Sequence, residues 1–243
     1  MSAGTVKSAR RVFEVLELFG RERRPLSLKQ VCAAFGYAPS SGAALLKSLV
    51  MLGYLDYDRR TRSYFPTMRL AQLGAWVESA LFGDGRVLKL MLRLHRETGE
   101  TVMLATQSDL SAQYMHAVGG AETMAVPAGT LRPLAISGMG WLLLSRHSEH
   151  EIEKLARRID VATGRRVDRA ALKRNITAVR RDGFVFSRHT VRRGTGIIAM
   201  LLPDEVHGRV FAIGLAGAVA RLEEKQAAIL ASLQRGMKRL SRM

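Results

Sequence analysis

The side chains with the clearest potential for chemistry lie between residues 40 and 62, where hydroxyl groups and cations recur on one expected surface. The outward face of a predicted helix carries Ser40, Ser41, Ala43, Ala44, Lys47 and Ser48, and the turn of the hairpin that follows carries Arg59, Arg60 and Arg62. Lysine and arginine neutralise phosphate groups, serine bonds to phosphate or to a base edge, and an alanine methyl contacts a thymine methyl. These residue types predict contacts with nucleic acid.

Residues that could catalyse a reaction or hold a metal are scattered. The sequence has no Gly-x-Ser-x-Gly elbow, no Walker loop and no cysteine–histidine cluster with zinc spacing. The single cysteine, Cys32, falls on the inner side of a predicted helix, and His147 and His150 begin another helix without a third ligand. We therefore expect no enzyme activity, no metal site and no cofactor.

A helix-turn-helix would position this surface. Ser27 and Gln30 have the spacing of a capping box, and Gly36 is placed to end the helix that they begin. The second helix is predicted to begin near Ser40 or Ser41, either of which could cap it. Its inward residues would be Gly42, Leu45, Leu46 and Leu49.

The flanking segments complete a winged helix-turn-helix. An amphipathic helix is predicted over residues 9–19, with Ser8 as its cap and Gly20 as its end. Residues 53–57 and 62–65 alternate as two strands around a polar turn and would form the wing. This motif lays its second helix in the major groove of DNA.

Composition agrees with a polyanion as partner. The 243 residues include 38 lysines and arginines against 21 acidic residues, a net charge of +17. The longest uncharged apolar stretch, residues 210–220, is too short to span a bilayer, and the N-terminus does not look like a signal peptide. With one cysteine, the chain is expected to be cytoplasmic and to have no membrane partner.

Four motifs resemble successive signatures of the IclR family of bacterial transcription regulators. They are Ser8-Ala9-Arg10, Pro25-Leu26-Ser27-Leu28, Gly53-Tyr54-Leu55 and Met68-Arg69-Leu70-Ala71-Gln72-Leu73-Gly74. The resemblance covers nearly the whole chain and adds Ser8, Arg10 and Ser27 to the candidate DNA contacts. It implies an α+β protein with an N-terminal winged helix-turn-helix, a linker helix and a C-terminal GAF-like effector domain with an antiparallel sheet. It also implies a homodimer or homotetramer.

The domain boundaries follow from breaks in the pattern. We expect a DNA-binding domain over residues 1–66, a linker helix over 67–84, and an effector-binding and oligomerisation domain over 85–243, because Gly83-Asp84-Gly85 interrupts the helical period. From residue 101 the period changes to two, which predicts strands over 101–107, 113–118 and 124–126. Two closing strands are expected within 194–204 and 210–217.

The second helix departs from the family pattern. Relatives usually show Lys-Ser-Thr, two further residues and Arg, whereas this chain has Pro39-Ser40-Ser41-Gly42-Ala43-Ala44. No outward residue before Lys47 is long enough for a bidentate contact with guanine or adenine. We expect DNA binding with shallow sequence discrimination, in which backbone contacts and groove shape carry more of the affinity. The alternative is a helix that no longer binds specifically.

The expected effector pocket departs as well. In relatives that bind small acids, an aspartate, a cysteine and two serines hold the ligand, and the matching residues here are Ser187, Ile197, Gly214 and Ala216. The full predicted set is Met103, Ser137, Gly138, Met139, Ser187, Ile197, Met200, Gly214 and Ala216. Because three polar groups are lost, we expect an effector larger and more apolar than glyoxylate or pyruvate, such as an aromatic acid or amide. The alternative is a pocket filled by side chains.

Two interpretations remain for a second basic segment. Residues 165–193 contain ten basic and two acidic residues. The segment is either a solvated surface, which we favour, or a second surface that contacts a polyanion. For the whole chain, the sequence predicts a transcriptional regulator, by family habit a repressor, that binds a double-stranded DNA operator and a small-molecule effector. The competing hypothesis is an architectural DNA-binding protein without an effector response.

Overall fold

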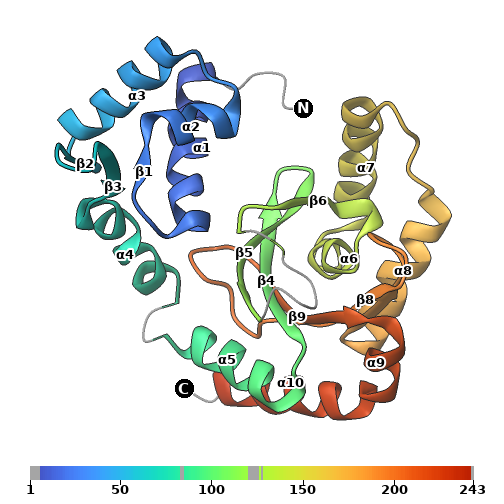
Figure 1. Cartoon of the computed structure of the whole chain (residues 1–243). Coiled ribbons are helices and arrows are strands. Elements are labelled where there is room, and N and C mark those ends of the chain that lie inside the picture. Colours follow the sequence, from blue (N-terminus) through green and yellow to red (C-terminus); the bar gives the residue numbers. More distant parts are fainter. Residues whose placement is uncertain (1–5, 83–84, 120–125, 127, 242–243) are drawn as a thin grey trace. The chain divides into compact units, whose positions relative to one another are not determined.

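The computed structural model divides the chain into two compact units, Met1–Ala80 and Leu81–Met243 (Figure 1). It describes residues 6–82, 85–119, 126 and 128–241. The expected strand at 124–126 and the expected break at 83–85 fall largely outside the described residues.

The N-terminal unit consists of helices and a small sheet with strand order β1-β3-β2 (Figure 1). Its elements are α1 (Lys7–Glu22), β1 (Leu26–Ser27), α2 (Leu28–Phe35), α3 (Pro39–Met51), β2 (Leu55–Asp58), β3 (Ser63–Pro66) and α4 (Met68–Phe82). The core joins α1, α2, α3 and the sheet through Val15, Val31, Leu46 and Leu55, which are all nearly inaccessible to solvent. Helix, turn, helix and wing therefore share one hydrophobic core, as a winged helix-turn-helix requires.

The predicted ends of α2 are confirmed. The hydroxyl of Ser27 accepts from the Gln30 amide while the Gln30 side chain accepts from the Ser27 amide, which closes the capping box. Gly36 ends the helix in the left-handed region at a φ of 66°.

The predicted ends of α1 and the predicted serine cap of α3 are wrong. Helix α1 begins at Lys7 after Val6, so Ser8 lies inside its first turn, and the helix continues through Gly20 until Arg23 turns left-handed. Helix α3 begins at Pro39 after Ala38, without a side-chain cap. Proline lacks an N–H and has its φ already fixed, so it starts a helix without the bond that a serine cap would supply.

The C-terminal unit is built on a six-stranded antiparallel sheet of order β6-β5-β4-β9-β8-β7 (Figure 1). The strands are β4 (Thr101–Ser108), β5 (Ser111–Val118), β6 (Leu131–Pro133), β7 (Val185–Arg188), β8 (Thr195–Leu201) and β9 (Phe211–Ala218). The helical elements are α5 (Arg86–Thr98), η1 (Leu134–Ile136), α6 (Gly138–Leu144), α7 (Glu149–Thr163), α8 (Arg169–Asp182), α9 (Val219–Glu224) and α10 (Gln226–Leu240).

Helices cover both faces of this sheet and create two cores. On one face α6, α7 and α8 pack against alternate strand residues such as Met103 and Ile197. On the other face α5, α9 and α10 pack against the intervening residues, such as Val102 and Ile198. Because successive strand residues point to opposite faces, adjacent residues of β4 and β8 enter different cores.

Candidate nucleic-acid interface and ligand cavity

Helix α3 presents the predicted surface. Gly42, Leu46 and Leu49 are buried, whereas the outward residues Ser40, Ser41, Ala44, Lys47 and Ser48 are exposed and Ala43 is half-buried. An added Cβ at Gly42 would collide with the sulfur of Cys32, so glycine lets α2 and α3 approach closely. Cys32 is buried, as the sequence predicted. The hydroxyl of Ser48 donates to the Ala44 carbonyl at 2.9 Å, so its proton is already used in a hydrogen bond within the helix.

The start of α1 contributes cations beside this face. A cleft of about 560 Å³ is lined by Lys7, Ser8, Arg11, Ser41, Ala44, Leu45, Ser48 and Val6. Ser8 therefore lies next to α3, as a DNA contact would require. Arg10 instead forms an ion pair with Glu14, with Nε and Oε1 3.4 Å apart. Lys7 and Arg11 were not predicted as DNA contacts, although their spacing of four residues places both on one face of a helix.

A tyrosine links α1 to the entry of α3. The Tyr37 hydroxyl donates to Glu14 Oε2 at 2.5 Å, and the guanidinium of Arg11 lies 4.6 Å from the centre of the Tyr37 ring. Burial, together with the bond to the Glu14 carboxylate, raises the pKa of Tyr37 to about 12. The network holds Arg11 at the cleft and fixes the turn before α3.

The wing is ordered by its own aspartate. Asp58 accepts from the backbone amides of Arg60 and Thr61 at 2.7 and 3.3 Å, and hydrogen bonds from the Thr61 side chain and the Arg60 amide lower the pKa of this carboxyl. Arg59, Arg60 and Arg62 are exposed and form no ion pair with any described residue. Ser27 differs from them, because its side chain is occupied as the cap of α2.

A cavity of about 160 Å³ lies beside the sheet of the C-terminal unit. It is lined by Met103, Tyr114, Val126, Arg132, Ser137, Gly138, Ser187, Thr190, Val191, Arg192, Thr195, Gly196 and Ile197. Three hydroxyls already have local partners: Ser137 accepts from the Gly140 amide at 3.1 Å, and Thr190 donates to Ser187 at 3.1 Å. Both serines keep further hydrogen-bonding capacity toward the cavity.

Five of the nine predicted pocket residues line this cavity, and four do not. Met103, Ser137, Gly138, Ser187 and Ile197 come together there. Met139 and Ala216 are buried in the adjoining core. Gly214 leaves no free volume for a ligand, because an added Cβ there would lie 2.6 Å from the Cβ of Ala199 and 3.0 Å from Ile197, which fill the space.

Met200 was predicted to line the pocket, and this prediction is wrong. It lies three residues after Ile197 on β8 and packs in the core on the opposite face of the sheet. An odd spacing along a strand reverses the direction of the side chain, so Met200 cannot wall the same cavity.

Arginine gives the cavity its electrostatic character. Arg132 and Arg192 are the charged residues that line it, and neither forms an ion pair with a described residue. Tyr114 is buried there, and burial raises the pKa of its hydroxyl. With no carboxylate among the described lining residues, the cavity could hold a ligand that carries negative charge next to an apolar body. The sequence argument missed both arginines because they come from β6 and the turn before β8.

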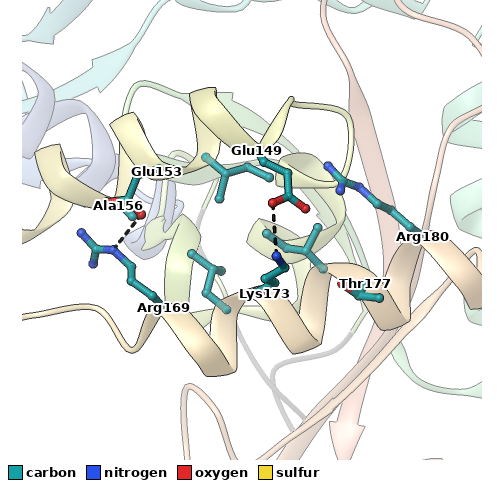
Figure 2. Close-up of a pocket in the computed structure, with 10 residues that line it drawn as sticks. Glu149, Glu153, Ala156, Arg169, Lys173, Thr177 and Arg180 are labelled. Atoms are coloured by element: carbon teal, nitrogen blue, oxygen red, sulfur yellow. Dashed lines mark hydrogen bonds and ion pairs between the residues drawn. The ribbon is translucent and has the colours of Figure 1, made fainter.

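A groove of similar size lies between α7 and α8, and its charges are arranged differently, because its cations have partners within the groove (Figure 2). Its floor is apolar, and its charged rims pair across it: Lys173 contacts Glu149 at 3.3 Å, and Arg169 contacts Glu153 at 3.3 Å (Figure 2). Arg180 donates to the carbonyl of Ser145. Each cation of this groove thus has an internal partner, and two ion pairs join its rims.

Ion pairs account for four of the ten basic residues in the segment 165–193. Arg169, Lys173, Arg181 and Arg188 each pair with a carboxylate. Nearby, His147 contacts Gln107 at 2.8 Å. No group of three metal-binding side chains occurs among residues that the structure describes.

An exposed helix face beside cations, carried by a winged helix, and a separate domain with a ligand-sized cavity define the class of DNA-binding transcriptional regulators. Family models agree: residues 8–59 match the IclR helix-turn-helix domain, and residues 86–242 match the bacterial transcriptional regulator IclR C-terminal domain. The chain belongs to the IclR family.

Two transcriptional regulators of known name are similar to this chain over most of their lengths. The transcriptional regulator XynR of Escherichia coli is 22% identical over 92% of this chain and 90% of its own length. The transcriptional repressor IclR of the same organism is 24% identical over 92% of this chain and 84% of its own length.

Solved structures share the architecture. The effector domain of an IclR regulator from Acinetobacter sp. ADP1 is 31% identical, with a TM-score of 0.62, over 68% of this chain and 99% of that domain. The IclR protein of Thermotoga maritima, 17% identical, matches the fold with a TM-score of 0.72 over 96% of this chain and 98% of its own. The α+β fold expected from the sequence is thereby confirmed. Within the described part of the chain, no helix is long and apolar enough to cross a membrane.

Proposed function

We propose that this protein is a repressor that releases or rearranges on its DNA operator when a small aromatic or apolar acid enters the cavity of the C-terminal unit. The main support for this proposal is the pair of arginines, Arg132 and Arg192, at the cavity. Its other walls include Met103, Val191 and Ile197. In this proposal residues 1–66 bind DNA, 67–84 connect the two domains, and 85–243 bind the effector and a second or further copies of the chain.

Paired winged helices of a homodimer or homotetramer would bind two half-sites of a partly symmetric operator. The outward residues of α3, with Ser8 and Arg11 from α1 and the arginines of the wing, would contact it. Serine and alanine are short, so phosphate contacts and groove shape would carry much of the affinity, and sequence discrimination would be shallow. A base-by-base footprint in which single substitutions each cost more than about 3 kcal/mol would contradict this point.

Cavity size limits the effector. An apolar cavity of about 150 Å³ accommodates benzene, and the cavity here has about 160 Å³. A one-ring carboxylate fits this volume and would place its charge at an arginine. Calorimetry should therefore find binding of benzoate-like acids and much weaker binding of glyoxylate and pyruvate. Tight binding of a two- or three-carbon acid would overturn the assignment.

The effector would act by shifting the population of oligomers whose winged helices match the half-site spacing, by no more than its differential affinity for the two states. The direct test measures binding to the promoter beside the protein's own gene and to a scrambled duplex, across salt concentrations. A preference for the promoter that survives physiological salt and changes with the acid is expected. Equal affinity for both duplexes, falling together with salt, would favour the architectural alternative, which the comparisons do not support.

A further inference from the structure

A basic groove lies between α5 and α10. It belongs to the C-terminal unit and is separate from the cavity. Helix α5 contributes Arg86, Lys89, Arg93 and Arg96, and helix α10 contributes Arg239. The floor is formed by Leu90, Gly236 and Leu240, and the groove has a volume of about 630 Å³. Five cations line it, and none of the described residues that line it is acidic.

The packing of the two helices produces this arrangement. Val87, Leu90, Met91 and Leu94 are buried against the sheet and α10, which leaves the cations of α5 on the outer side. An added Cβ at Gly236 would lie 2.6 Å from Leu90, so this glycine lets α10 come close to α5. The groove therefore has a fixed apolar floor beneath a row of positive charges.

Three of the five cations of this groove have no ionic partner among the described residues. Arg93 contacts Glu97 at 3.6 Å, but Glu97 also faces Arg235 at 3.8 Å and accepts from Ser232 at 2.7 Å. Lys89, Arg96 and Arg239 form no ion pair with a described residue. The α7–α8 groove, by contrast, sets a carboxylate opposite its cations (Figure 2). Like charges three or four residues apart on a helix repel each other, and an anion in the groove would remove that cost.

The spacing suits an extended anion. The residues of α5 from 86 to 96 rise about 15 Å along the helix, and a DNA strand carries one phosphate per about 3.4 Å of axis. A compact anion would meet only part of this row. Residues 81–243 also hold 26 basic and 15 acidic residues, against 12 and 6 in residues 1–80, so most of the excess charge lies outside the winged helix.

We propose that the α5–α10 groove is a second DNA-binding surface, which holds the sugar-phosphate backbone of a duplex without reading its sequence. It would add to the affinity of the full chain for any duplex and would respond steeply to salt. The winged helix would supply whatever sequence preference the protein has.

The test compares two triple variants of the full chain with the same loss of charge. The groove variant is Lys89→Gln, Arg96→Gln and Arg239→Gln; the control variant is Lys154→Gln, Arg165→Gln and Arg174→Gln, whose residues are exposed and lie outside both the groove and its helices. All six side chains are on the surface, and thermal unfolding verifies that both variants fold. The probe is a scrambled duplex, with binding followed by fluorescence anisotropy across salt concentrations.

The groove variant should bind about tenfold to hundredfold more weakly at low salt, with a slope of log K against log salt shallower by about 2 to 3, since each lost phosphate contact removes about 0.9. The control should keep its slope. Equal losses in both variants would attribute the effect to net charge, and no loss in the groove variant would exclude DNA; either result overturns the proposal. A groove variant that loses binding of inorganic tripolyphosphate but not of DNA, or that changes only the oligomeric state in sedimentation, overturns it as well.

Discussion

The hydroxyl of Tyr37 donates to the carboxylate of Glu14 at 2.5 Å and so ties the middle of α1 to the residue that precedes α3 by two positions. The same tyrosine ring supports the guanidinium of Arg11 at 4.6 Å. One side chain thereby couples the placement of α3, the helix proposed to face DNA, to the placement of a cation beside it.

Tyr37→Phe should loosen this connection while keeping the ring. Losing one partly exposed hydrogen bond to a charged group is expected to lower the free energy of unfolding by about 1 kcal/mol. The raised pKa adds a pH signature: the stabilisation is complete below the unfolded value of 10.0 and is lost as pH rises through about 12. Denaturation of both proteins between pH 8 and pH 12 tests this, because the difference between them should shrink at the alkaline end. A constant difference would mean that the bond contributes nothing.

Arg11→Gln tests the cation that the cleft reveals. Arg11 lines the cleft beside α3, and its guanidinium should contact phosphate, so the variant is expected to bind every duplex more weakly and to shift the slope of log K against log salt by about 1. Arg10→Gln is the matched control, because Arg10 is already paired with Glu14. A larger loss with Arg10→Gln than with Arg11→Gln would restore the residue that the sequence resemblance favoured.

Two glycines of the C-terminal unit separate ligand binding from folding. An added Cβ at Gly138 would lie 2.6 Å from the Ser187 hydroxyl, a short side chain beside the cavity, whereas at Gly140 it would collide with the backbone of Leu134. Gly140→Ala should therefore destabilise the fold by about 1–3 kcal/mol, since backbone cannot move aside cheaply. Gly138→Ala should cost less stability and more ligand affinity. Calorimetric unfolding and titration with a benzoate-like acid distinguish the two, and the reverse order would refute the cavity geometry.

Arg132 should determine the charge preference of the cavity. Arg132→Met keeps a similar length and removes the cation, so it is expected to weaken an aromatic acid by about 1.5–3 kcal/mol while leaving the corresponding amide nearly unchanged. Titrations with the paired ligands give the ratio directly. Equal weakening of both ligands would show that Arg132 shapes the cavity without recognising charge.

Local signals in the sequence predicted the N-terminal unit well because short-range chemistry decides them. The Ser27–Gln30 box and Gly36 fix α2 whatever surrounds it. The start of α3 was misplaced because two serines and a proline compete within three residues, and proline needs no cap. The cavity was only half predicted. Ile197 and Met200 are close in sequence, yet strand alternation separates them, and Arg132 reaches the cavity from a strand far away in the chain.

The buried carboxylate of Glu100 accepts two hydrogen bonds from Arg221, at 2.9 and 3.0 Å. This ion pair joins the start of β4 to α9. The Glu100 side chain is 1% exposed and that of Arg221 is 44% exposed, so the two partners are not equivalent. Removing the arginine leaves a buried charge whose one remaining ion-pair partner among the described residues is Lys225, 3.7 Å away, whereas Glu100→Gln leaves a cation that water can still reach.

Arg221→Ala should therefore destabilise the C-terminal unit more than Glu100→Gln does, by roughly 1–2 kcal/mol. Chemical denaturation of the two variants and of the double variant measures the order and the coupling. The double variant should be more stable than Arg221→Ala alone, because it no longer buries an uncompensated carboxylate. If Glu100→Gln proved the more damaging change, the ion pair would contribute more to stability than an unpaired buried carboxylate costs, which contradicts the prediction.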